Sequence, residues 1–344
     1  MKYGKILVYM ATLGICILVG CGGRAEKAVL TYKDSQIAMG TLVSQVYYGT
    51  ETEDLEGRTD CVAEFLNDLE KQGISWRESG SELAFINENA GKGALEVTEA
   101  MNSYLKQAFE VSAGSGGAFD ITIGEVVRLW DLDTVAAGEK DFEMPSETEI
   151  AEQLENCGYE KVTLTGSSIA LPDEMQLDMG AIGKGIACDE IYELCNDGDY
   201  ATITGGIVSV GGSIVAIGEK PDGTAYKVSI VHPREEGSIG VVAMKDGEFL
   251  STSGDYERYV MYEGTRYHHI LDPTTGYPAE SGVCSVTIVS HSGLLSDALS
   301  TACFVLGEEE GMALADAYGA KILMVREDKS LVMNAGMKAV FAVQ

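Results

Sequence analysis

The feature that most limits the fold of this sequence is the grouping of its strand-forming segments. From Val162 onward, short runs rich in β-branched residues are separated by Gly, Asp and Pro turns. The expected strands cover 162–164, 207–210, 213–217, 226–231, 322–325 and 339–343. Because these strands follow one another instead of alternating strictly with helices, the pattern predicts an α+β fold and not a doubly wound parallel sheet.

Helical spacing of apolar residues appears in the first half and in two later segments. It predicts helices near 62–69 and 101–108, and the pair Ser146 and Glu149 forms a capping box for a helix through Leu154. Further helices are expected over about 180–194 and 296–318. A length of 344 residues allows one large domain or two ordinary ones.

The first twenty residues read as a targeting segment. Lys2 and Lys5 precede an uncharged apolar run over 6–20, and the small residue Gly20 stands directly before Cys21. This pattern is typical of a lipoprotein signal. An uncleaved membrane anchor fits less well, because the run is shorter than the ~20 residues of a spanning helix.

Cleavage of that signal would leave Cys21 as a lipidated N-terminal residue carrying acyl chains such as palmitate. The expected organisation is a signal peptide over 1–20, the lipidated cysteine with a tether over 21–28, and a folded domain over 29–344. We therefore expect a protein anchored to the cell membrane by lipid and facing the extracytoplasmic side.

Charge and cysteine content exclude several classes of function. Lys and Arg total 24 against 54 Asp and Glu, a net charge of -30, which repels nucleic-acid phosphates. No Cys-x-x-C pair occurs, so a zinc or redox site is not expected, and the disulfide state stays open. The six cysteines of the mature chain are Cys61, Cys157, Cys188, Cys195, Cys284 and Cys303.

Common catalytic motifs are missing as well. The segment 180–185 lacks the first glycine and the Ser/Thr of a P-loop, and 114–117 does not match a dinucleotide fingerprint. There is no Gly-x-Ser-x-Gly, no His-Glu-x-x-His, and only four histidines. On spacing alone, Asp297 and Thr301 share a helix face that suits Mg²⁺, although Ser296 or Asp297 capping that helix is the simpler reading.

Several segments taken together resemble the ApbE family of flavin transferases, in the family's order and across nearly the whole mature chain. The matching segments are 39–41 (MGT), 81–83 (SEL), 178–185 (DMGAIGKG), 253–259 (SGDYERY), 268–273 (HHILDP), 297–301 (DALST) and 304–307 (FVLG). The resemblance implies an ApbE-like fold, with antiparallel or mixed sheets flanked by helices in a single large catalytic domain.

The resemblance also implies an activity and its residues. An enzyme of this family binds FAD, cleaves its diphosphate with Mg²⁺ or two metal ions, and transfers FMN to a Thr or Ser hydroxyl with release of AMP. His269 matches the proposed catalytic base. The positions that match FAD contacts are Met39, Trp76, Ala118, Phe119, Asp120, Asp178, Lys184 and Ile270. Those that match metal ligands are Ala181, through its carbonyl, and Asp297, Ser300 and Thr301.

Two positions depart from the family pattern. Ser213 stands where Asn or Asp is usual, and a serine lacks the two donors of an amide. Trp76 stands where tyrosine is usual, and it should keep the stacking on a flavin while moving the polar atom. We expect FAD binding to be retained.

Two alternative functions remain open from the sequence. If water attacks in place of an acceptor hydroxyl, the same site is an FAD pyrophosphatase that yields FMN and AMP. An extracytoplasmic FAD-binding lipoprotein would need neither Asp297 nor His269. The partners implied by the resemblance are FAD and extracytoplasmic acceptor flavoproteins such as Rnf- or Nqr-type subunits, with no nucleic acid.

Overall fold

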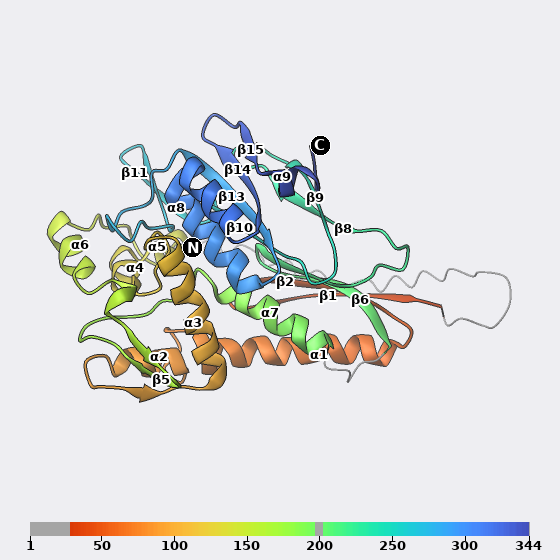
Figure 1. Cartoon of the computed structure of the whole chain (residues 1–344), viewed down its shortest axis with the longest axis horizontal. Helices are drawn as coiled ribbons and strands as arrows, with labels where there is room; N and C mark the ends of the chain where they lie inside the picture. The colour runs from red at the N-terminus through yellow and green to blue at the C-terminus, as the bar shows by residue number, and fades with distance from the viewer. Residues whose placement is uncertain (1–27, 197–201, 344) are drawn as a thin grey trace, which may run out of the picture.

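The structure, a computed structural model, describes residues 28–196 and 202–343. An eight-stranded sheet in the order β1-β2-β6-β7-β10-β13-β14-β15 forms its centre, and all neighbouring strands in it are antiparallel. Helices cover one face and a three-stranded sheet, β16-β9-β8, covers the other (Figure 1). The expected α+β class is confirmed. The predicted signal over 1–20 and nearly all of the tether lie outside the described residues.

The elements of these layers have the following bounds. The central sheet comprises β1 (Leu30–Ala38), β2 (Thr41–Gly49), β6 (Ile203–Val210), β7 (Ser213–Gly218), β10 (Phe249–Gly254), β13 (Val283–Ser290), β14 (Lys321–Arg326) and β15 (Leu331–Met333). The second sheet comprises β8 (Tyr226–Val231), β9 (Ser238–Met244) and β16 (Phe341–Val343). The main helices are α1 (Thr52–Asp68), α3 (Glu99–Gly114), α7 (Gly183–Asn196) and α8 (Gly293–Ala317).

Smaller elements form a lobe beside these layers. They are the π-helix η1 (Leu69–Ile74), the helices α2 (Glu82–Glu88), α4 (Gly124–Trp130), α5 (Leu132–Ala136) and α6 (Glu147–Leu154), the turn η2 (Tyr159–Lys161), and the strands β3 (Leu95–Glu96), β4 (Thr163–Thr165) and β5 (Ser168–Ala170). The hairpin of β11 (Tyr259–Tyr262) and β12 (Thr265–His268) lies by the lobe, and α9 (Ala335–Lys338) precedes β16.

Most elements expected from the sequence are present. The capping box is confirmed, because the Ser146 Oγ accepts from the Glu149 N–H at 3.3 Å while Glu149 accepts from the Ser146 N–H at 2.9 Å. One expectation is wrong in part. The helix predicted over 296–318 is broken at Gly307, whose φ of 76° and ψ of -165° are not helical.

The first hairpin, β1 and β2, was not expected from the sequence. Its turn is Met39–Gly40, with φ of 50° and 65°, and Ala38 pairs with Thr41. Two consecutive residues at positive φ make the two-residue turn that matches the twist of a hairpin. The turn therefore fixes the position of Met39, which the family resemblance had marked.

Apolar packing joins the layers. The larger core lies between the central sheet and the helices, with Val208, Ile288, Leu66, Ile186 and Phe304 among its members. A second core lies between the two sheets, and a third around Trp130 joins α4 and α6 to the β11–β12 hairpin. Within the described residues, no helix has the length and apolar character needed to cross a membrane.

Helices α7 and α8 cross with their backbones in contact. A methyl group on Gly185 would overlap the Gly293 carbonyl, and one on Gly293 would overlap the Gly185 carbonyl. Asp189 of α7 fixes the start of α8 by accepting from the Gly293 N–H at 2.6 Å and the Leu294 N–H at 2.8 Å. A carboxylate at this end also complements the helix dipole. Burial nevertheless raises the pKa of Asp189 to about 6.

This contact predicts the effect of one added methyl group. Gly185→Ala should lower the free energy of unfolding by roughly 2–3 kcal/mol, because overpacking between two backbones has no flexible side chain to absorb it. Thermal or urea unfolding measures the change. Gly80→Ala is the control, since a Cβ there would come no closer than 3.9 Å to its neighbour. Equal stability of the two variants would contradict the close crossing.

Candidate functional site

A cleft lies where the loop before α7 faces α8 and the base of the β11–β12 hairpin, and it has two adjoining cavities. We call them the His269 cavity and the Met39 cavity after one residue of each; their volumes are about 140 Å³ and 690 Å³. Seven residues line both cavities and form their common wall. These are Arg77, Asp133, Asp178, Gly180, Lys184, Glu257 and Arg258.

The cleft collects almost all the site residues expected from the sequence. Met39 and Trp76 line the Met39 cavity, and Asp178 and Lys184 line both. The His269 cavity also contains Ala118, Phe119, Asp120, Ala181, His269, Ile270, Asp297 and Thr301. Ser300 is the exception. It is buried and lines neither cavity. Its hydroxyl donates to the Asp297 carbonyl at 2.9 Å and contacts the Ser253 Oγ at 2.7 Å.

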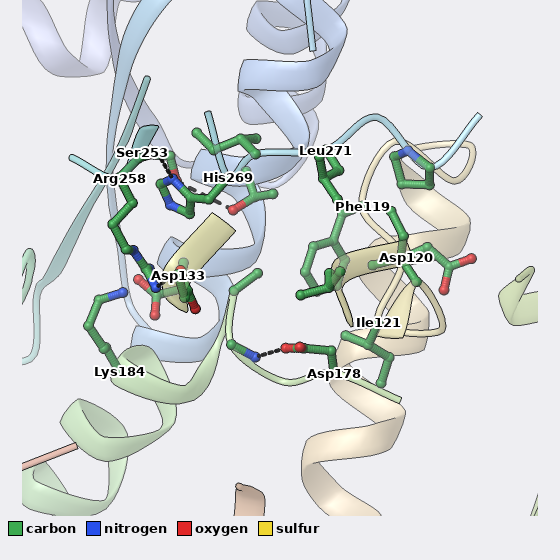
Figure 2. Close-up of a pocket in the computed structure, with 18 of the residues that line it drawn as sticks. Phe119, Asp120, Ile121, Asp133, Asp178, Lys184, Ser253, Arg258, His269 and Leu271 are labelled. Atoms are coloured by element: carbon green, nitrogen blue, oxygen red, sulfur yellow. Dashed lines mark hydrogen bonds and ion pairs between the residues drawn. The ribbon is translucent and has the colours of Figure 1, made fainter. Parts of the chain in front are cut away.

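The loop that enters α7 is held by hydrogen bonds from three segments. The Asn87 side chain bonds to both backbone polar groups of Leu177: it accepts from the N–H at 2.8 Å and donates to the carbonyl at 2.9 Å. The Asp178 N–H then donates to the Ile121 carbonyl at 2.7 Å. These hydrogen bonds fix the direction of the Asp178 side chain, which accepts from the Gly180 N–H at 2.6 Å (Figure 2).

Trp76 bonds to the same carboxylate. Its Nε1–H donates to Asp178 Oδ2 at 2.7 Å. The guanidinium carbons of Arg77 and Arg128 lie 4.1 Å and 4.5 Å from the centre of the Trp76 ring. Cation–π contacts of this kind compete with a stacked ligand ring. A flavin that stacks on Trp76, as the resemblance implies, would therefore have to displace a guanidinium group.

Asp120 has a structural role that the sequence did not suggest. Its carboxylate points away from the other labelled side chains in Figure 2. It accepts from the Thr122 N–H and the Tyr159 N–H, both at 2.8 Å. Burial raises the pKa of Asp120, and these hydrogen bonds oppose that rise. The carboxylate ties η2 to the loop that carries Phe119, whose ring faces the cavity.

Asp297 and Thr301 lie on one face of α8, as their spacing predicts. The helix is capped by the Ser292 side chain, which accepts from the Leu295 N–H, so the interpretation of Ser296 or Asp297 as its cap is wrong. Asp297 instead accepts from the Gly185 N–H at 2.6 Å and from the Ser213 hydroxyl at 2.7 Å. Ser213, one of the two departures, thus orients the carboxylate with a single donor.

These groups fit a hard divalent cation. The Gly185 N–H is directed to Asp297, and within the described residues no hydrogen bond reaches the Ala181 carbonyl. The Asp297 carboxylate, the Ala181 carbonyl and the Thr301 hydroxyl all belong to residues that line the His269 cavity, and they are oxygen donors of the kind that Mg²⁺ takes, with water or substrate oxygens completing the shell. No cluster of three or more His, Cys, Asp and Glu side chains suited to a metal occurs within 28–196 and 202–343.

The two adjacent histidines have different environments. His268 Nε2 donates to the Ala279 carbonyl at 3.2 Å and its Nδ1 accepts from the Ile270 N–H at 3.3 Å, so both nitrogens are used within the fold. His269 Nδ1 lies 3.2 Å from the Arg258 carbonyl, which only accepts. Nδ1 of His269 therefore carries the proton, and Nε2 is left as an acceptor.

Cations gather in the cleft of this acidic chain. Arg77, Lys184 and Arg258 all line both cavities. Sequence reasoning found Lys184 but gave the two arginines no role. Arg258 lay inside a family-like segment, and a concentration of arginines in a chain of net charge -30 was the signal that could have drawn attention to both.

Comparison with known proteins gives consistent matches. Residues 39–324 match the ApbE family. The chain is 33% identical to the FAD:protein FMN transferase of Treponema pallidum, over 94% of this chain and 92% of that protein. It is 29% identical to the Vibrio cholerae protein of the same name, over 92% of each.

Solved structures agree with these matches. The ApbE protein of Thermotoga maritima superposes with a TM-score of 0.81 at 30% identity, over 90% of this chain and 99% of that one. The apo form of the Pseudomonas stutzeri flavinyl transferase ApbE superposes with a TM-score of 0.77 at 28% identity, over 91% of this chain and 98% of that one.

The environment of His269 predicts its titration. Burial, together with the charges of Arg258 and Lys184, holds the pKa of His269 well below its usual value near 6.5. The imidazole should therefore stay neutral as the pH falls from about 8 to about 6, a range in which an unperturbed histidine becomes largely protonated. NMR titration, with the signal assigned by its loss in His269→Gln, measures this. Arg258→Gln should raise the pKa, and a wild-type value at or above 6.5 would contradict the assignment.

Proposed function

Because the chain belongs to the ApbE family, we propose that it is an FAD:protein FMN transferase. It cleaves the diphosphate of FAD, joins FMN to a Thr or Ser hydroxyl of an acceptor protein, and releases AMP. The observation that carries the proposal is the meeting of His269, Lys184 and Asp297 in one cleft, although these residues are far apart in the sequence.

The proton transfer is assigned to His269. Its Nε2 accepts the proton of the acceptor hydroxyl, while the Arg258 carbonyl holds Nδ1–H and so fixes the tautomer. The hydroxyl oxygen forms a bond to the phosphorus on the FMN side, and the bond from that phosphorus to the bridging oxygen breaks, so that AMP leaves with the electron pair. A depressed pKa keeps Nε2 unprotonated at neutral pH.

The rest of the site orients the diphosphate and balances its charge. Lys184 on the common wall supplies positive charge where phosphate oxygens develop negative charge. Asp297, the Ala181 carbonyl and Thr301 would hold Mg²⁺, which when bound polarises the phosphoryl oxygens. Ser300 lies outside the cavity and orients the Asp297 backbone by donating to its carbonyl.

The decisive assay combines FAD, Mg²⁺ and a protein that carries an acceptor segment. Wild-type protein should give a covalent FMN adduct, seen by in-gel fluorescence and intact mass, with AMP in equal amount. His269→Ala should lower the rate by roughly 10²- to 10⁴-fold, the usual contribution of a general base. Asp297→Asn should lose the Mg²⁺-dependent formation of the adduct. Asp316→Asn, on an exposed part of the same helix, is the matched control.

The same assay separates the alternatives. AMP and free FMN without an adduct would indicate an FAD pyrophosphatase. FAD that binds but is not cleaved would indicate a binding lipoprotein, and either result would overturn the transferase.

We further propose that lipidation of Cys21 anchors the enzyme to the extracytoplasmic face of the cell membrane, near acceptor flavoproteins such as Rnf- or Nqr-type subunits. The support is the basic and apolar N-terminal pattern that ends at Cys21. Cys21→Ala should move the protein from the membrane fraction to the soluble fraction or leave it unprocessed, and it should lose incorporation of labelled palmitate. Unchanged labelling would rule out this anchor.

A further inference from the structure

Three charged residues form a bridge across the common wall of the cleft. Arg258 donates from Nη1 to Asp133 Oδ1 at 2.8 Å, and Arg77 donates from Nη2 to Asp133 Oδ2 at 3.3 Å. Arg77 follows η1, Asp133 lies on α5, and Arg258 precedes β11, so the bridge joins three distant segments. Figure 2 shows Asp133 beside Arg258 at the same wall as Lys184. One carboxylate therefore divides its two oxygens between two arginines.

The other aspartates of the cleft are occupied elsewhere. Asp120 accepts from two main-chain N–H groups, and Asp178 accepts from Gly180 and Trp76. Asp297 accepts from Gly185 and Ser213. Among the cleft aspartates of the described residues, Asp133 alone directs its carboxylate to guanidinium groups of the cleft.

The bridge is of a kind that a phosphate can replace. A guanidinium group binds carboxylate and phosphate oxygens through the same planar set of donors. A diphosphate offers more negative charge and more acceptor oxygens than one carboxylate. The pair of Arg258 and Asp133 is 41% and 34% exposed, and ion pairs with that much solvent are weak. Exchange of Asp133 for a diphosphate is therefore energetically accessible.

We propose that Asp133 is an internal competitor, which occupies Arg77 and Arg258 until the diphosphate of FAD takes its place; this rests on the proposed function. Arg258 holds His269 through its carbonyl, and Arg77 lies over the Trp76 ring. A diphosphate on these arginines lies between the base on one side and the aromatic ring on the other. Asp133 thereby tunes the affinity of the site for diphosphates and selects against ligands that lack one.

The test measures binding of FAD, inorganic diphosphate and riboflavin by calorimetry to wild-type protein and Asp133→Asn. The variant keeps the shape of the side chain and removes its charge. FAD and diphosphate should bind about three- to tenfold more tightly, in proportion to two solvent-exposed ion pairs, while riboflavin should bind equally to both proteins. Arg77→Gln should weaken diphosphate binding.

Asp131→Asn is the matched control for charge that acts without a bridge, because Asp131 pairs with Lys140 at 3.2 Å and feels the charge of Arg77 without an ion pair to either arginine. Tighter binding in both aspartate variants would overturn the proposal, since a general field effect would then explain it. Unchanged or weaker binding in Asp133→Asn would also overturn it, and would mean that the carboxylate orients the arginines. Binding of inorganic diphosphate tests the role of Asp133 without any transfer reaction. The proposed function fails separately, if FAD is neither bound nor cleaved.

Discussion

The site depends on how closely α7 and α8 cross. Gly185 and Gly293 bring the two backbones into contact, and this proximity lets the Gly185 N–H reach the Asp297 carboxylate at 2.6 Å. The same bond leaves the Ala181 carbonyl free at the cleft. Any larger residue at the crossing would separate the carboxylate of one helix from the carbonyl before the other. The position of Asp297 relative to the loop before α7 thus depends on the absence of two side chains.

Different hydrogen-bond donors give three carboxylates of the cleft separate tasks. Burial raises the pKa of Asp120 and of Asp178, so each of these carboxylates needs donors to stay ionised. Main-chain N–H groups hold Asp120, Trp76 and Gly180 hold Asp178, and two arginines hold Asp133. Although the chain has a net charge of -30, Arg77, Lys184 and Arg258 line both cavities of the cleft, where a diphosphate can reach them. Burial, together with the charges of Arg258 and Lys184, disfavours an imidazolium and lowers the pKa of His269.

The sequence predicted the residues of the site better than their contacts. The resemblance to the ApbE family, carried by motifs in order along the chain, marked His269, Asp297 and Lys184, and all three line the His269 cavity. The resemblance did not show that Asp120 binds main-chain N–H groups, unlike Asp178, which also bonds to Trp76. It also did not show that Ser300 lies outside the cavity and bonds to the Asp297 carbonyl. The Arg77–Asp133–Arg258 bridge joins three segments and has no local signature. Strand β1 escaped prediction because it is a polar edge strand with one half-buried face. The break at Gly307 is accompanied by a contact from outside the helix, in which the Ser281 hydroxyl donates to the Phe304 carbonyl.

We propose that Asp297, oriented by Gly185 and Ser213, anchors a divalent cation in the cleft. Titration of the protein with Mn²⁺ in place of Mg²⁺, followed by electron paramagnetic resonance in the presence of FAD, tests it most directly. We expect saturable Mn²⁺ binding to wild-type protein, weaker binding to Ser213→Ala, and loss of the bound signal in Asp297→Asn. Equal Mn²⁺ affinity in wild-type protein and Asp297→Asn would contradict it.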